Sequence, residues 1–376
     1  MTDKHTGLKI LIIGQTPPPY GGQAVLINHI LRGNYTGLTL YHVRMAFSDE
    51  MDQIGRFYWK KILRLIAIVI EVYRLRFRED ITALYYPPAP SATIPVLRDL
   101  VILLMTRWLF SKVIFHFHAY GVSSWCKRRS RLVRALFARA YFYSDAAIHN
   151  SCATMEDARE LRTKRDFIIP CGIADVAKSS RLAPCRLSSS SVPVILYVGA
   201  VSEEKGALVL LEAVGALRSR GERCQVNIVG KFTSSEFESV MKETVHRYHI
   251  DEDVHFLGVL TGEEKNDAYR NGDIFCFPSH ASIETFGIVV LEAMSFGLPV
   301  VAAQWRAMPE VIQDGINGLL FPVKDAAALA NCIHGLIQDP DMRRQLGRNG
   351  RSIFEKEYTL DRYYERIANA FRAVGG

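Results

Sequence analysis

The pattern that most constrains the fold is an alternation of short apolar runs with longer helix-like stretches. It occurs once in the first half of the chain and again after a serine-rich segment at Lys178–Val192. Apolar runs of strand length that alternate with helix-length stretches are typical of parallel sheets covered by helices. The sequence therefore predicts two doubly wound α/β units in series, joined near the serine-rich segment.

The expected elements can be given by range. In the first half we expect helices at 24–31, 57–76 and 91–109, and strands at Lys9–Gly14, Leu38–Val43, Ala83–Tyr86, Val113–Phe117 and Ala146–His149. In the second half we expect helices at 207–219, 235–249, 263–271 and 288–296, and strands at Val194–Gly199, Gln225–Gly230, Val254–Leu257, Ile274–Phe277 and Pro299–Ala302. Ligands of such sheets bind outside the carboxyl ends of the strands, so two facing units predict a ligand cleft between them.

Length and composition narrow the class of protein. The chain has 376 residues, 49% apolar and 23% charged, which is a folded composition and too long for one compact core. Its seven cysteines are scattered without a CxxC pair, which indicates a reducing compartment and no zinc cluster. No secretory signal and no run of about 20 apolar residues is present. We therefore expect a cytoplasmic protein.

Charge is unevenly divided along the chain. Residues 1–190 carry 27 Lys and Arg against 14 Asp and Glu, whereas the remainder carries 19 against 25. The basic half suits an anionic membrane surface or a polyanionic acceptor, and nucleic acid is not expected because no recognition motif is present. Two basic patches, Arg56–Lys61 and Cys126–Arg131, suit peripheral attachment to anionic lipid. The solvated face of a packed helix is the alternative.

A glycine-containing loop follows the first expected strand. It runs from Gly14 to Gly22 with the sequence GQTPPPYGG, so Gly21 and Gly22 directly precede a helical stretch. Glycines there allow backbone amides to approach a phosphate at a helix N-terminus. Its prolines and late glycines do not fit the G-x-G-x-x-G pattern of NAD-binding loops. A phosphate-binding loop and a plain turn both remain open.

A second strand-to-helix turn opens the second half of the chain and contains Gly199 and Lys205. A lysine at a helix N-terminus opposes the helix dipole, which costs about 0.3–1 kcal/mol unless an anion binds there. A bound diphosphate would reverse that sign, and an exposed lysine in a turn is the alternative. Gly230, which ends the next strand, is a further candidate for donor binding.

Two glutamates mark the most informative segment. Glu284 lies in a loop of small residues after a buried strand, and Glu292 lies on the helix that follows. At helical rise, the step between them spans about 12 Å, roughly the length of a sugar joined through a diphosphate to a ribose. The amides of Phe286, Gly287 and Ile288 at the helix start are then placed to receive phosphate oxygens.

The alternative is that Glu284 caps the helix and Glu292 is a surface charge. The apolar neighbours of Glu292 on this helix, Val289–Leu291 and Ala293, favour burial instead. A buried carboxylate needs a partner, and we therefore expect one.

These residues resemble a known family. The spacing of Glu284 and Glu292 matches the E-x7-E motif of family 4 retaining glycosyltransferases of the GT-B fold, and the segments at 293–302 and 309–320 resemble the same family. The resemblance covers essentially the whole chain. It implies two facing Rossmann-like domains with an interdomain cleft, residues 1–187 for the acceptor and 188–357 for the nucleotide-sugar donor. It also implies that a helix at about 358–376 packs back on the first domain.

The resemblance assigns a role to each candidate. Glu284 would contact the transferred sugar, Glu292 the ribose and Lys205 the diphosphate, while the loop at Gly21 and Gly22 would close over the donor. The implied catalytic residues are Glu284, His118 and Lys205, and the implied donor-binding residues are Gly21, Gly22, Gly199, Lys205, Gly230, Phe286, Gly287, Ile288 and Glu292.

His118 has two alternatives to the catalytic role that the resemblance implies. It ends the run Phe115–His118 and takes the family's histidine position beside the donor sugar. His116 and His118 lie on one face of a strand and would suit a metal pair, but no third ligand follows at a suitable spacing, so no metal site is expected. A core histidine lined by aromatic residues is the remaining alternative.

The sequence departs from the family pattern at two places. Ala200 stands where the family commonly has arginine, which removes one of two cations expected on the leaving group, and Cys171-Gly172 stands in place of Asn-Gly.

The resemblance implies metal-independent, retaining transfer from a UDP- or GDP-sugar to a lipid-linked or polysaccharide acceptor, in cell-surface or exopolysaccharide biosynthesis. The donor is a substrate, and no cofactor is expected. The expected location is the cytoplasm, with peripheral attachment at the inner face of the cytoplasmic membrane. A GT-B-type sugar-nucleotide epimerase, a phosphorylase and a nucleotide-sugar-binding homologue with weakened catalysis are the alternatives.

Overall fold

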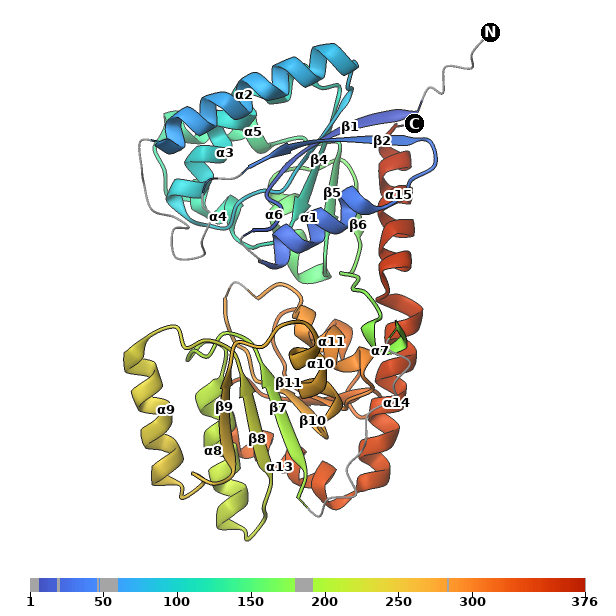
Figure 1. Ribbon diagram of the computed structural model, residues 1–376. Helices are drawn as coiled ribbons and strands as arrows, with labels where there is room; N and C mark the ends of the chain where they lie inside the picture. Colours follow the sequence, from blue (N-terminus) through green and yellow to red (C-terminus); the bar gives the residue numbers. More distant parts are fainter. Residues whose placement is uncertain are drawn as a thin grey trace. The chain divides into compact units, whose positions relative to one another are not determined.

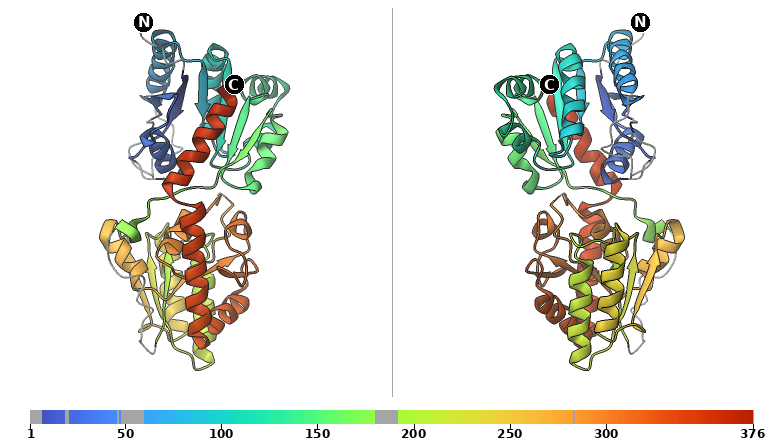
Figure 2. Two further views of the ribbon diagram at one scale, coloured as in Figure 1. Left: turned by 90° about the vertical axis from the view of Figure 1, so that its right-hand side faces the viewer. Right: turned by 90° about the vertical axis from the view of Figure 1, so that its left-hand side faces the viewer.

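The computed structural model describes residues 7–18, 21–45, 47, 60–179, 192–282 and 284–375. The chain forms two compact units (Figures 1 and 2). The first unit comprises Met1–Gly172 and Leu360–Gly376, and the second comprises Ile173–Thr359. The units divide after Gly172, whereas the sequence places the division after residue 187. Most of the serine-rich segment, residues 180–191, lies outside the described residues.

The first unit is built on a six-stranded parallel sheet with the order β2-β1-β3-β4-β5-β6. Its strands are β1 Leu8–Gly14, β2 Leu38–Arg44, β3 Ala83–Tyr86, β4 Lys112–Phe117, β5 Ala146–His149 and β6 Asp166–Ile168. The chain proceeds from β1 to β2 on one side and then continues from β3 on the other. The strand order therefore reverses between β1 and β3, which is where ligands of doubly wound sheets bind.

Helices cover both faces of this sheet (Figures 1 and 2). One face carries α2 Lys60–Glu79, α3 Thr93–Thr106, η2 Arg107–Leu109, α4 Val122–Lys127, α5 Arg131–Tyr141 and α6 Met155–Glu160. The other face carries α1 Gly22–Arg32 and α15 Leu360–Gly375, which contact each other. Phe371 of α15 packs edge-on against Tyr85 of β3, with ring centroids 6.0 Å apart, so a segment distant in sequence completes this unit.

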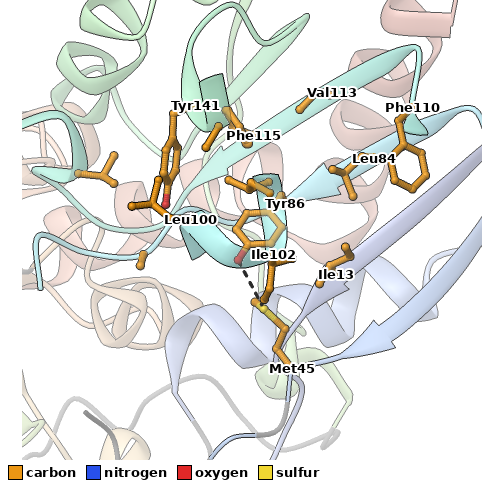
Figure 3. Packing of buried hydrophobic residues seen from close by; sticks show 14 of the residues in the cluster. Ile13, Met45, Leu84, Tyr86, Leu100, Ile102, Phe110, Val113, Phe115 and Tyr141 are labelled. Atoms are coloured by element: carbon orange, nitrogen blue, oxygen red, sulfur yellow. Dashed lines mark hydrogen bonds between the residues drawn. The ribbon is translucent and has the colours of Figure 1, made fainter. Parts of the chain in front are cut away.

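The core on the α2–α3–α5 face surrounds one buried carboxylate. Strand side chains such as Ile13, Leu84 and Phe115 interdigitate with helix side chains (Figure 3). Asp99 is fully buried there and accepts hydrogen bonds from the Tyr86 hydroxyl at 2.7 Å and the Ala89 amide at 2.8 Å. Arg98 also pairs with Asp99, which supplies the partner that a buried charge needs. Asp99 thereby fixes the loop that follows β3.

The second unit repeats the architecture with the strand order β12-β11-β10-β7-β8-β9, all parallel. Its strands are β7 Val194–Val198, β8 Gln225–Val229, β9 Val254–Gly258, β10 Ile274–Phe277, β11 Val300–Ala303 and β12 Gly318–Phe321. The strand order reverses between β7 and β10.

The helices of the second unit include α8, which follows β7, and α11, which follows β10. The helices of this unit are α7 Val176–Ser179, α8 Ala207–Ser219, α9 Ser235–Arg247, α10 Gly262–Arg270, α11 Ile288–Ser295, α12 Met308–Val311, α13 Ala326–Gln338 and α14 Pro340–Glu357. Together with the first unit, they confirm the prediction of two doubly wound parallel sheets.

Several elements differ from the expectation. The sequence did not predict the strands β6 and β12 or the short helices α4, α6, α7 and α12. It also did not predict the longer helices α5, α13 and α14. The stretch at 91–109 is α3 followed by a separate 3-10 turn, η2. The helix expected at 57–76 is α2, which begins at Lys60 and continues to Glu79, while residues 57–59 lie outside the described part.

Candidate functional site

The loops after β7 and β10 are joined at the strand-order reversal of the second sheet. The His280 amide donates to the Glu204 carbonyl at 2.9 Å, which ties the two loops together through the backbone. Gly206, the N-cap of α8, has φ +74°, and a Cβ at this position would lie 2.2 Å from the Pro278 carbonyl oxygen. Only glycine permits this approach. The sequence did not single out Gly206, although it lies beside Lys205.

Lys205 and Glu284 meet at this junction. The Lys205 Nζ lies 2.5 Å from Glu284 Oε2, and the Ser279 hydroxyl lies 3.2 Å from the same oxygen. Both charged side chains are largely buried, so the pair is better shielded from solvent than a surface ion pair. Two predicted catalytic residues are therefore in contact at the amino end of α8.

Glu292 has the partner that its apolar surroundings require. Lys265 of α10 donates to Glu292 Oε1 at 2.7 Å, and the Tyr269 hydroxyl donates to Oε2 at 2.7 Å. Burial, followed by the nearby carboxylate, raises the pKa of the Tyr269 phenol well above its usual value. Tyr269 therefore stays protonated as a donor. Lys265 and Tyr269 escaped sequence reasoning because nothing in the spacing links α10 to α11.

The start of α11 lies between the two glutamates in sequence. Gly287 is its N-cap, with φ +73°, and no side chain caps this helix by a hydrogen bond. Glu284 therefore does not act as the helix cap that was the alternative. Phe286 is buried and packs edge-on against Tyr358 at 6.0 Å, while Ile288 begins the helix.

Gly199 and Gly230 bring the ends of β7 and β8 together. A Cβ on Gly230 would lie 1.8 Å from the Gly199 carbonyl oxygen, so this approach requires glycine. Ala200 follows, and its carbonyl accepts a hydrogen bond from the Tyr197 hydroxyl at 2.7 Å. At Ala200, where the sequence departs from the family pattern, this hydrogen bond from Tyr197 holds the backbone.

Trp305, between β11 and α12, braces the loop that carries Glu284. Its indole Nε1 donates to the Ala281 carbonyl at 2.9 Å. The Arg306 guanidinium lies over the Trp305 ring, 5.0 Å from the ring centroid. No sequence pattern predicted this support.

In the first unit, side chains of β2 hold the loop that follows β1. His42 Nε2 donates to the Gly14 carbonyl at 3.0 Å, and Arg44 Nη2 donates to the Pro18 carbonyl at 2.7 Å. Gly21 is the N-cap of α1, and Gly22 is its first residue. These two predicted glycines therefore lie at a helix start beside the strand-order reversal of the first sheet.

His118 follows β4 and belongs to a buried polar cluster. The Tyr85 hydroxyl lies 2.7 Å from His116 Nδ1, and His116 Nε2 lies 3.0 Å from Asn150 Oδ1. His118 closes the cluster with two longer contacts of 3.5 Å, from Nδ1 to Asn150 Nδ2 and from Nε2 to the Tyr85 hydroxyl. The rings of His116 and His118 are 3.9 Å apart.

Burial keeps both histidines neutral. It lowers the pKa of His116 to about 3. Burial also lowers the pKa of His118 well below its usual value, and the repulsion that a second protonated ring would meet from His116 adds to this. Hydrogen bonds to Tyr85 and Asn150 occupy both ring nitrogens of His116. Among the residues that the structure describes, no group of three or more His, Cys, Asp or Glu side chains suits a metal ion.

The loop after His118 is held by one carboxylate. Asp157 of α6 accepts hydrogen bonds from the amides of Gly121 at 2.7 Å and Ser123 at 2.9 Å. This carboxylate positions the backbone at the carboxyl end of β4. No sequence pattern pointed to it.

Comparison with known proteins shows which family the second unit resembles. The family model described as Glycosyl transferases group 1 matches residues 186–353, which include Lys205, Glu284 and Glu292. Residues 186–353 form a group 1 glycosyltransferase domain. The HepE protein of Anabaena, solved in complex with UDP, has the same fold, with a TM-score of 0.74 and 20% identity over 97% of this chain and 100% of that chain. The expected GT-B fold of two parallel α/β units is confirmed.

Two relatives indicate the range of proteins that contain similar sequence. Alpha-D-kanosaminyltransferase of Streptomyces kanamyceticus is 27% identical over 183 residues, which are 49% of this chain and 46% of that protein. O-antigen chain mannosyltransferase C of Escherichia coli is 27% identical over 253 residues, 66% of each chain. The match spans less than half the length of the first curated relatives that the chain resembles.

Proposed function

We propose that this protein transfers a glycosyl group from a nucleoside diphosphate sugar to a hydroxyl of a glycan or lipid-linked acceptor. Transfer retains the anomeric configuration and uses neither a metal ion nor another cofactor. The proposed location is the cytoplasm, and the proposed role is in the synthesis of cell-surface or exported polysaccharide. The group 1 domain supports glycosyl transfer, and the finer assignments rest on the geometry of the second unit.

The contact of Lys205 with Glu284 carries the proposal. An ammonium group and the amino end of α8 together form a positive site at the reversal of strand order, where doubly wound sheets bind ligands. Glu284 is the hydrogen-bond acceptor beside this site. Such a pair suits a ligand that carries an anion next to a sugar hydroxyl.

Departure of the nucleoside diphosphate is the demanding step, because negative charge develops on its phosphate oxygens. Lys205 and the amides at the start of α11 stabilise that charge. The bond from the anomeric carbon to the diphosphate oxygen breaks, and the acceptor oxygen bonds to that carbon on the same face. The acceptor proton passes to the leaving diphosphate, so no enzymic nucleophile is required.

The remaining residues position the donor. Glu292, held by Lys265 and Tyr269, binds the ribose hydroxyls, since two hydrogen bonds fix the orientation of its carboxylate. Neutral His118 contacts the donor sugar, and Gly21 and Gly22 accept the donor at the start of α1.

Uridine and guanosine donors both remain within the proposal. HepE was solved with UDP and with UDP-glucose, which supports a uridine nucleotide. A polysaccharide acceptor is supported by the similarity to a protein named O-antigen chain mannosyltransferase C. The loss of arginine at Ala200 leaves Lys205 as the cation proposed for the diphosphate.

A thermal-shift screen of nucleoside diphosphates and their sugars tests the donor assignment. A ligand at 100 times its dissociation constant stabilises the folded protein by about 2.7 kcal/mol, which is readily detected. Glu292→Gln should reduce the shift, whereas Glu284→Gln should retain binding and lose transfer. Glu238→Gln is the matched control, because Glu238 also pairs with a lysine in the second unit, at 2.6 Å.

The products distinguish the alternatives. The proposal is supported if sugar is transferred to an acceptor extract and NMR of the product shows that the anomeric configuration is unchanged. Epimerised nucleotide sugar without an acceptor would identify an epimerase, and sugar phosphate formed from a glycan and phosphate would identify a phosphorylase. Tight binding with no turnover on any acceptor would identify a binding protein.

A further inference from the structure

Helix α3 exposes a continuous apolar stripe to solvent. Ile94, Leu97, Val101 and Met105 follow one another at helical spacing, and Trp108 of η2 continues the line with 65% of its surface exposed. A helix on the surface of a globular protein normally presents polar residues on this side. An exposed apolar line of this length indicates a surface that is covered in use.

A second stripe on α2 lies beside the first. Ile66, Ile70 and Phe77 of α2 are exposed at the same helical spacing. Tyr73 connects the two helices, because its hydroxyl donates to the Met105 carbonyl at 2.9 Å and its ring lies 6.2 Å from that of Trp108. The two stripes therefore form one surface.

Helix α5 extends this surface on the other side of α3. Arg107 joins the helices by donating to the Ala140 carbonyl at 2.7 Å and to the Phe142 carbonyl at 2.6 Å. On α5, Leu132 and Leu136 are exposed. We call the exposed apolar residues of α2, α3, η2 and α5 named in these paragraphs the apolar face.

Positive charge borders the apolar face. Arg64 and Arg74 of α2 and Arg131, Arg134 and Arg139 of α5 are exposed. The single carboxylate of α3, Asp99, is buried, and the sequence of α5 contains no acidic residue. Arginines beside apolar residues suit a surface whose outer layer is anionic and whose interior is apolar.

A cavity of about 770 Å³ lies beside α5 and is lined by residues of α4, α5 and α6. Its cations are Lys127, Arg131 and Arg134, and its apolar lining includes Phe137 and Phe142. Lys127 pairs with Glu160, whereas Arg131 and Arg134 form no ion pair with any described residue. Two guanidinium groups that form no ion pair with a described residue, next to apolar side chains, suit the phosphate of a lipid headgroup.

We infer that the apolar face docks the first unit onto an anionic lipid bilayer, with lipid phosphate bound by Arg131 and Arg134. Of the patch at Cys126–Arg131, Arg131 belongs to this site, whereas Lys127 pairs with Glu160 and Arg129 stacks on Trp125 at 4.4 Å. The other expected patch, Arg56–Lys61, has no described side chain.

The charge argues against a second copy of the chain as the occupant. In a twofold dimer the same surface meets itself, so one interface would collect two copies of the α5 arginines, and α5 contains no acidic residue to pair with them. An anionic bilayer neutralises them instead. None of the described helices is long and apolar enough to cross a membrane. The inference concerns a surface of the first unit and stands apart from the proposed transfer reaction.

Cosedimentation of the full chain with vesicles tests the inference without any turnover. Binding is expected to vesicles that contain phosphatidylglycerol and to fall with rising salt, with much weaker binding to phosphatidylcholine alone. The variant Leu97→Gln/Val101→Gln/Met105→Gln should bind at least about tenfold more weakly. Arg131→Gln/Arg134→Gln should bind about 20-fold more weakly to the anionic vesicles.

Matched variants in the second unit control for general surface effects. Val240 is exposed to the same extent as Val101, 43%, and Val240→Gln/Leu257→Gln/Val259→Gln removes the same number of exposed apolar residues. Arg344→Gln/Arg348→Gln removes the same charge from α14. Both control variants should bind vesicles like the wild type.

Four outcomes would overturn the inference. One is the absence of vesicle binding by the wild-type chain, and another is undiminished binding by the apolar triple variant. The third is a wild-type dimer that the triple variant converts to a monomer while neither binds vesicles, which would make this face a contact between copies. Inorganic phosphate tested alone separates a free phosphate site from a lipid site, because displacement of vesicles by millimolar-range phosphate at constant ionic strength would also contradict a lipid-specific contact.

Discussion

Lys205 Nζ and Glu284 Oε2 lie 2.5 Å apart, although 79 residues separate them in the sequence. The contact exists because β7 and β10 are neighbours in the sheet and their following loops leave the same edge. A cation and a carboxylate are thus held at the place where this fold binds ligands.

Replacing Lys205 tests its role on the diphosphate. Lys205→Met removes the ammonium group at the amino end of α8, so the dissociation constant of a nucleoside diphosphate should rise about 10- to 100-fold. Titration calorimetry measures this change. Lys242→Met, which breaks another lysine–glutamate pair of the same unit, should leave it unchanged. Equal affinity of Lys205→Met and wild type would remove Lys205 from the site.

Tyr269→Phe tests the support of Glu292. The change deletes a hydrogen bond to a largely buried carboxylate, so the free energy of unfolding should fall by about 1–3 kcal/mol. Nucleotide binding should weaken as well, because Glu292 loses one of its two fixed contacts. Denaturant titration and calorimetry measure the two effects. The half-buried Tyr248 offers a control, and Tyr248→Phe should change stability by less than about 0.5 kcal/mol.

Gly206→Ala separates backbone strain from steric conflict. Gly206 and Gly221 both have positive φ, +74° and +80°, so alanine at either position costs about 1–2 kcal/mol of stability. A Cβ at 206 also meets the Pro278 backbone, whereas one at 221 meets nothing within 4 Å. Gly206→Ala should therefore be the more destabilising change in urea unfolding and should alone weaken nucleotide binding. Equal losses in the two variants would show that the loops after β7 and β10 adjust freely.

The neutral histidines make the first unit sensitive to acid. The folded pKa of His116, about 3, lies below the unfolded value of 6.5, so its contribution to stability is complete above pH 6.5. That contribution is lost as the pH falls from 6.5 toward 3, at about 1.4 kcal/mol per pH unit. The pKa of His118 is also lowered by burial, so its contribution to stability falls with falling pH as well. Denaturant unfolding followed between pH 7 and pH 5 should show this decline.

The variant His116→Asn should flatten that pH dependence, because an amide does not titrate. His246→Asn is the control, since His246 is exposed on α9 and its change should leave the slope as in the wild type. A wild-type stability that is constant over this pH range would contradict the burial of neutral imidazoles at 116 and 118.

The fold was largely predictable where apolar periodicity was strong. Strand β3 at Ala83–Tyr86 and helix α8 at Ala207–Ser219 have the predicted bounds because their residues are mostly buried. Strand β6 escaped prediction, since Asp166–Ile168 is short and half exposed at a sheet edge. Periodicity reports burial, and this edge strand is held by its backbone pairing with β5.

The site was predictable in its residue types but not in its contacts. The apolar neighbours of Glu292 correctly indicated a carboxylate that needs a partner. They could not identify Lys265 or Tyr269, because that pairing depends on how α10 packs beside α11. The same limit hid Asp157, whose bonds to the loop after β4 join segments far apart in sequence.

The first unit is built from two chain segments, one before and one after the segment that forms the second unit. The later segment supplies α15, which completes the face of the sheet that contains Tyr85. During synthesis on the ribosome, Ile173–Thr359 emerges before Ile367 and Phe371, which are buried in the first unit. The second unit can therefore mature while the first still has part of one sheet face open to water. The half that is translated earlier is the one that finishes folding later.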